Sequence, residues 1–210
     1  MGTDEADYGA IIHAGEMFQK HLDKTELDKA NYTPEGFKDQ IAQFAKTDAA
    51  LAVDKAVENA QSRVESALAK ADKVRAGLSP DGDTAAELRA TRYWNRTKGV
   101  LDANQTSAHS LAQKLIGEAT REELGTLLQE LPTYLQTIGA PTSWLDEYIA
   151  RAIPEYGATK AEVDQATHSL QLIQAAAKFV RDGIANGRAP NKQVLDMVNP
   201  STARRPARRY

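Results

Sequence analysis

The chain has 210 residues, no cysteine, and a formal net charge of −3 from 26 basic and 29 acidic side chains. The absence of cysteine excludes disulfides, thiolate catalysis, and iron–sulfur or zinc-ribbon sites. The acidic balance excludes a protein whose whole surface attracts nucleic acid. The first nine residues carry three acidic side chains and no basic one, so we expect no classical secretion signal.

The composition favours helices. The sequence contains 35 alanines, about one residue in six, and alanine has the highest helix propensity. Few segments alternate apolar and polar residues as a half-buried strand does. We therefore predict an all-α protein. No uncharged run is long enough to cross a membrane, so we expect a cytoplasmic protein, or one within an assembled particle, with no membrane contact.

The first helix is predicted over residues 4–27, where apolar residues recur at spacings of three and four. Thr33 and Pro34 are typical of a helix start, as N-cap and first helical residue. Two apolar stripes follow, and they are out of phase around residues 47–50. We expect a bend or a change of partner there, and whether residues 34–77 form one continuous helix stays open.

A second long helix is predicted over residues 84–118. Glycine at position 77 and the Ser-Pro-Asp-Gly turn at residues 79–82 end the preceding segment. Thr84 and Glu87 then form a capping box. Because a short connection between two long helices favours an antiparallel pair, we predict a long antiparallel helical hairpin.

The last third of the chain is divided into shorter helices by Pro and Gly, and it is predicted to form a smaller C-terminal helical bundle packed on the hairpin. We therefore divide the chain into three regions. Residues 1–118 hold the first helix and the hairpin, residues 119–198 are the C-terminal helical region, and residues 199–210 are an extended basic tail.

Residues that would indicate catalysis are missing from the sequence. It has no glycine-rich phosphate loop and no nucleophile elbow. A di-iron helical bundle needs a glutamate three residues before a histidine, and none of the four histidines has one. We predict a protein that is not an enzyme, with no metal site and no cofactor.

One face of the second long helix is basic. At about 100° per residue, Arg89, Arg92, Tyr93 and Arg96 fall on one side of it. Three guanidinium groups beside an aromatic ring are suited to hold phosphates or to stack on a base, so these residues are a candidate site for nucleic acid or another anion. The alternative is that the nearby carboxylates of Glu87, Asp72 and Asp83 pair with these cations.

The tail is the second candidate for anion binding. Its arginines are Arg204, Arg205, Arg208 and Arg209, and it contains no acidic residue. Arginine and proline together do not form a packed core, so the segment is predicted to be extended. It is suited to contact phosphates or an acidic protein surface, and the alternative is a solvated tail without a partner.

Three functions remain compatible with the sequence. The first is a non-enzymatic structural or assembly protein, such as a subunit, scaffold or adaptor of a larger homo-oligomeric assembly of viral type. Its partner is a second copy or another protein, because the body is acidic and the tail is basic. The second is a nucleic-acid-binding protein that uses the arginine face and the tail. The third is a small helical inhibitor or regulator of a protein partner.

Overall fold

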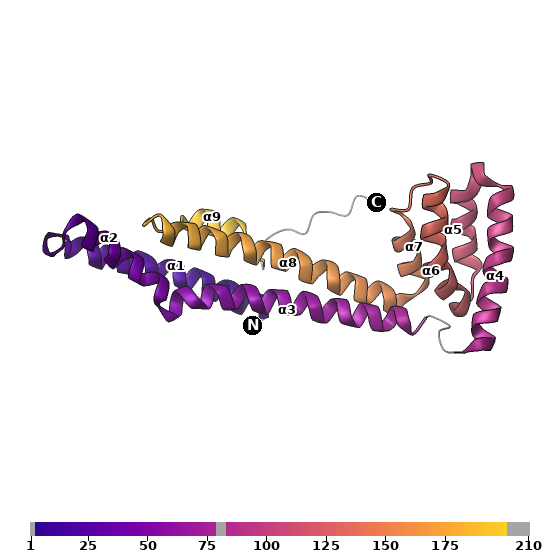
Figure 1. Cartoon of the computed structure of the whole chain (residues 1–210), viewed down its shortest axis with the longest axis horizontal. Coiled ribbons are helices and arrows are strands. Elements are labelled where there is room, and N and C mark those ends of the chain that lie inside the picture. The colour runs from indigo at the N-terminus through magenta and orange to yellow at the C-terminus, as the bar shows by residue number, and fades with distance from the viewer. Residues whose placement is uncertain (1–2, 79–82, 201–210) are drawn as a thin grey trace. The chain divides into compact units, whose positions relative to one another are not determined.

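A computed structural model describes residues 3–78 and 83–200 of the chain. Within these ranges the regular structure is helical, with no strand, which confirms the all-α prediction (Figure 1). The helices and the short 3₁₀ turns are α1 (Thr3–Leu27), η1 (Lys29–Asn31), α2 (Pro34–Ala42), η2 (Gln43–Lys46), α3 (Asp48–Ala76), α4 (Thr84–Ala103), η3 (Gln105–Ser107), α5 (Ala108–Glu118), α6 (Arg121–Thr137), α7 (Leu145–Ala152), α8 (Pro154–Ala185) and α9 (Lys192–Met197). The predicted turn at residues 79–82 lies outside the described residues.

A break at Thr47 answers the open question about residues 34–77. This residue has an extended backbone, with φ −79° and ψ 155°, so α2 and α3 are separate helices. Its hydroxyl donates a hydrogen bond to the Phe44 carbonyl at 2.7 Å and accepts one from the Ala50 N–H at 3.3 Å. Thr47 therefore caps α3, and the expected bend is confirmed at this position.

The prediction of one helix over residues 84–118 is wrong. Asn104 leaves the helical conformation, with φ −133° and ψ 42°, and it separates α4 from η3 and α5. Its side-chain amide donates to the carbonyl of Val100 at 2.9 Å. Asparagine competes in this way for backbone groups, which makes it a good place for a helix to end.

The chain forms two compact units that are discontinuous in sequence. Residues up to 65 and residues from 165 onward form unit 1, and residues 66–164 form unit 2. The predicted regions 1–118 and 119–198 follow the chain order instead, and they stay a prediction.

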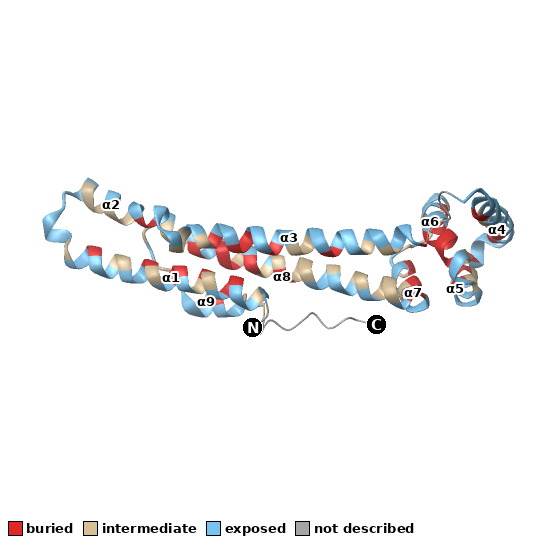
Figure 2. Ribbon diagram, turned by 90° about the horizontal axis from the view of Figure 1, so that it is seen from below, coloured by how far each residue is buried: buried red, intermediate tan, exposed pale blue. Residues whose placement is uncertain are grey.

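Unit 1 has a core built from four helices (Figure 2). Most of the residues that α3 and α8 contribute to this core are Ala or Val. The core residues are Tyr8, Ile11, Ala14, Val53, Ala56, Val57, Ala60, Ile173, Ala176, Ala177, Val180 and Leu195. The Tyr8 hydroxyl donates to the Leu195 carbonyl at 2.8 Å, which fixes α9 on α1.

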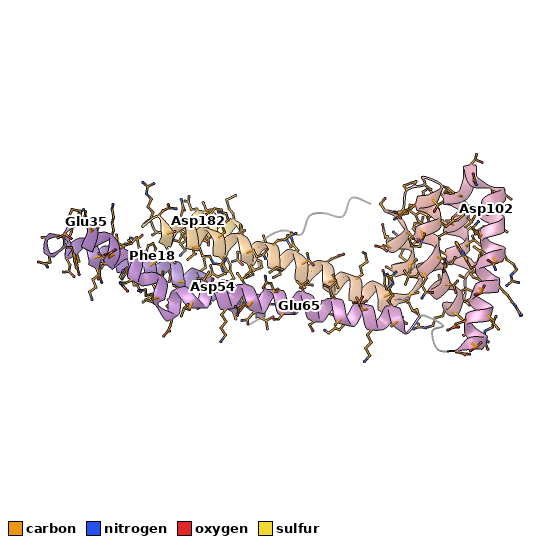
Figure 3. All side chains as sticks on the ribbon, viewed as in Figure 1. Phe18, Glu35, Asp54, Glu65, Asp102 and Asp182 are labelled. Carbon is orange, nitrogen blue, oxygen red and sulfur yellow. The ribbon has the colours of Figure 1, made fainter. Side chains whose placement is uncertain are left out.

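A polar cluster also ties α1 to α3 in unit 1. Arg63 contacts Asp7 at 2.6 Å and Asp4 at 2.9 Å. Asn59 donates to the other carboxylate oxygen of Asp7 at 2.8 Å. Asp7 is buried, and the contacts with Arg63 and Asn59 offset the cost of removing its carboxylate from water. At the edge of the unit, Arg181 on α8 donates to Asp54, labelled in Figure 3, at 2.9 Å.

Unit 2 packs α4 to α7 around a leucine-rich core. Its fully enclosed side chains include Leu101, Leu127, Leu131, Leu135, Ile149 and Ile153. The backbone of α6 comes so close to Leu78 that a Cβ on Gly125 would lie 2.0 Å from the Leu78 carbonyl oxygen. The predicted hairpin is not confirmed, because α3 supplies core residues beside α1 and α8, whereas α4 packs with α5, α6 and α7.

Candidate functional site

The four predicted site residues on α4 line one groove in unit 2. Arg89, Arg92, Tyr93 and Arg96 form one wall of this open groove, which has a volume of about 610 Å³. We call it the arginine groove. Its other wall is the beginning of α6, with Thr120, Glu122, Glu123 and Thr126. The helical repeat therefore brings together the α4 residues that the sequence singled out.

The three arginines of the groove differ in their partners. Arg89 donates from Nε to Glu122 at 3.0 Å, so its charge is paired. Within the described part of the chain, Arg92 and Arg96 form no salt bridge, and both are exposed. Glu123 accepts a hydrogen bond from the Thr120 N–H at 2.7 Å, as part of a capping box. The groove thus holds two guanidinium groups that are open to an anion.

Tyr93 gives the groove its aromatic surface. The ring is half-buried and packs on the core of unit 2. Burial raises the pKa of Tyr93, and the charge of Glu123 adds to this, while a hydrogen bond from Thr97 and the charge of Arg96 act in the opposite direction. The phenol is therefore neutral near pH 7, and the ring is held in place without being covered.

The carboxylate that pairs with the arginine face was missed by the sequence analysis. The carboxylates considered from the sequence were those of Glu87, Asp72 and Asp83, but the one that bonds to Arg89 belongs to Glu122, 33 positions away in sequence. Only the packing of α6 beside α4 brings it there. The tail residues Arg204, Arg205, Arg208 and Arg209 lie outside the described residues.

A second groove lies in unit 1, and it is mostly apolar. It has a volume of about 810 Å³ and runs between α2 and the end of α8. We call it the apolar groove. Its apolar lining includes Tyr32, Pro34, Phe37, Ile41, Ala42 and Ile184. Lys29 at its rim lies over the Phe37 ring at 5.1 Å and pairs with Glu26 at 2.6 Å.

The apolar groove exists because α2 is amphipathic yet contributes no buried residue. Thr33 caps the helix by accepting from the Gly36 N–H at 3.1 Å, as the sequence predicted. Figure 3 labels Glu35, which is exposed on α2. The apolar stripe of α2 could be recognised in the sequence, because periodicity shows which residues share one face of a helix. That the stripe is only partly buried could not be recognised, because periodicity does not show which element packs on that face.

Within residues 3–78 and 83–200, no group of three or more acidic, histidine or cysteine side chains is arranged to hold a metal ion. In the same ranges, the helices are too short or too polar for any of them to cross a membrane. No protein-family model matches the chain, and comparisons with curated proteins and with solved structures gave no match.

Proposed function

We propose that the protein is a non-enzymatic helical subunit, scaffold or adaptor that assembles with further copies of itself. The observation that carries this proposal is the apolar groove, together with the helix α2 that has no buried residue. An amphipathic helix is stable when its apolar face is covered. Here the face of α2 is covered only in part, so a partner would complete it.

Apolar side chains of the groove and of the segment that precedes it in sequence are exposed. Tyr32 lines the groove while remaining 37% exposed, and Leu27, two residues before the lining residue Lys29, is 86% exposed. Single exposed apolar residues are ordinary, but a groove with a mostly apolar lining is typical of a protein interaction site.

Charge supports a second copy as the partner. Residues 1–62 carry 12 acidic and 6 basic side chains, and the tail carries four arginines and no acid. The two surfaces are complementary in sign, so the tail of one copy is attracted to the body of another. This attraction would act alongside apolar contact at the groove.

The groove is tested by sedimentation velocity of the full chain over a wide concentration range. We expect Tyr32→Ser with Phe37→Ser to weaken self-association by roughly tenfold or more, because both rings are lost from the contact. Leu88→Ser is the matched control, since Leu88 is 52% exposed on α4 and does not line this groove. Circular dichroism checks that the helices are retained. An unchanged association in the double variant would exclude the groove as the contact.

Deleting residues 199–210 tests the contribution of the tail. We expect the shortened chain to assemble more weakly than the full chain. The difference between the two chains should be smaller at high salt, where charges are screened. Assembly that is unchanged by the deletion would exclude bridging by the tail while leaving the groove contact untouched.

A further inference from the structure

The arginine groove shares no lining residue with the apolar groove on which the proposed function rests. Arg92 and Arg96 remain accessible to an anion because the acidic residues of α4 lie on other faces of that helix. At about 100° per residue, Glu87 is about 180° and Asp102 about 120° from Arg96 around the axis. Asp102, labelled in Figure 3, accepts instead from Lys98 at 2.7 Å and from Tyr134 at 2.9 Å.

The open cations are spaced for neighbouring phosphates. Arg92 and Arg96 are one turn apart on α4, which separates their positions by about 6 Å along the axis. A guanidinium group binds phosphate oxygens in a bidentate manner, and it keeps its charge at any ordinary pH. Tyr93 lies between them in the sequence and faces the same groove, where it offers a ring for stacking.

The acidic wall of the groove disfavours binding of a polymer with closely spaced negative charges. Glu122 and Glu123 face the three arginines, so the lining keeps only one net positive charge. Duplex DNA presents a phosphate about every 1.7 Å along its axis, and its bases are already stacked. A single strand places fewer charges in the groove and has free bases to stack on an aromatic ring.

We infer that the arginine groove binds single-stranded nucleic acid, with phosphates at Arg92 and Arg96 and a base on Tyr93. Arg89 is a positioning residue, because its bond to Glu122 joins the two walls of the groove. The contact is short and local, which agrees with the acidic character of the whole chain.

Fluorescence anisotropy of the full chain with a labelled single-stranded oligothymidylate tests this inference. We expect Arg92→Gln with Arg96→Gln to weaken binding roughly tenfold at low salt. A plot of the logarithm of the association constant against the logarithm of the salt concentration has a negative slope. This slope should become shallower by about 1.4 in the double variant, since each phosphate contact of a single strand contributes about 0.7. The matched control is Lys20→Gln with Lys24→Gln, because these exposed lysines are also one turn apart and form no salt bridge among the described residues.

The tyrosine is tested separately. Tyr93→Phe keeps the ring and should bind as the unaltered chain does, whereas Tyr93→Leu should bind several-fold more weakly. No binding at low salt would overturn the inference, as would equal losses in the arginine and lysine variants. A duplex of the same sequence that binds as tightly as the single strand would also overturn it. None of these outcomes bears on self-association through the apolar groove.

Discussion

The two grooves are supported in different ways by the helices beneath them. In the arginine groove, Tyr93 rests on a closed core, and the polar side chains extend from a helix that is already packed. In the apolar groove, α2 contributes nothing to the buried core, and its apolar side chains are the groove itself. Unit 2 therefore presents charged side chains on a closed core, whereas unit 1 presents an apolar surface that a partner would complete.

The largest expected effect comes from the close approach of α6 to Leu78. Gly125→Ala would place a methyl group 2.0 Å from a carbonyl oxygen, so the backbone must shift. We expect a loss of about 3 kcal/mol in the stability of unit 2, measured by urea unfolding. Gly117→Ala is the control, because its added Cβ meets nothing within 4 Å, and it should stabilise the chain by about 0.5 kcal/mol. Equal stability of the two variants would show that α6 is not packed in this way.

In unit 1, the second largest loss of stability is expected in the polar cluster of Asp4, Asp7, Asn59 and Arg63. Asp7→Ala removes one of the two carboxylates that contact Arg63 and the acceptor of the Asn59 side-chain amide. We expect a loss of about 1–3 kcal/mol, because partly buried polar groups lose their hydrogen bonds. Asp23→Ala should cost less than about 0.5 kcal/mol, since this carboxylate is exposed and accepts its hydrogen bond from the exposed Gln19 of the same helix. A loss in Asp7→Ala no larger than that of Asp23→Ala would contradict the role of the cluster.

Alkaline pH should act on unit 2 through Tyr134. Burial, together with the hydrogen bond to Asp102 and the charge of that carboxylate, raises the pKa of Tyr134 to about 12. The unfolded value is about 10, so the stabilisation is complete below pH 10 and is lost as pH rises toward 12. We expect Tyr134→Phe to flatten this part of the pH–stability curve relative to the unaltered chain. An alkaline slope in Tyr134→Phe that equals the slope of the unaltered chain would contradict the role of Tyr134.

The smallest effect on stability is expected at the arginine groove. Arg92→Gln with Arg96→Gln removes two exposed charges that have no salt bridge within the described ranges. The unfolding free energy should change by less than about 0.5 kcal/mol, even where oligonucleotide binding is lost. A large destabilisation would show that these arginines support the fold rather than a surface site.

Local features of the fold were predictable from the sequence because they depend on neighbouring residues. Thr33 caps α2 and Thr47 marks the break before α3, as the sequence predicted. The capping box predicted at Thr84 and Glu87 is wrong, because Asp83 caps α4 by accepting from the N–H groups of Ala85 and Ala86. The α4 face of the arginine groove was also predictable, since only the helical repeat is needed to align it.

Features that depend on distant packing were not predictable. The stripe along α3 indicates a buried face, but nothing in it selects α1 and α8 as partners. The pairing of Arg89 with Glu122 depends on how α6 packs on α4, and Asn104 ends α4 inside an otherwise regular apolar pattern. The apolar groove was missed because it depends on how little of α2 the rest of unit 1 covers.

Self-association is the central claim, and the absolute mass of the full chain tests it most directly. Light scattering after size exclusion, at several concentrations and at low and high salt, gives this mass, and the 260/280 nm absorbance ratio is recorded with it. We predict particles of several copies that grow with concentration and shrink at high salt. A monomer of 22.9 kDa under every condition would contradict the account and would favour a regulator of a different protein.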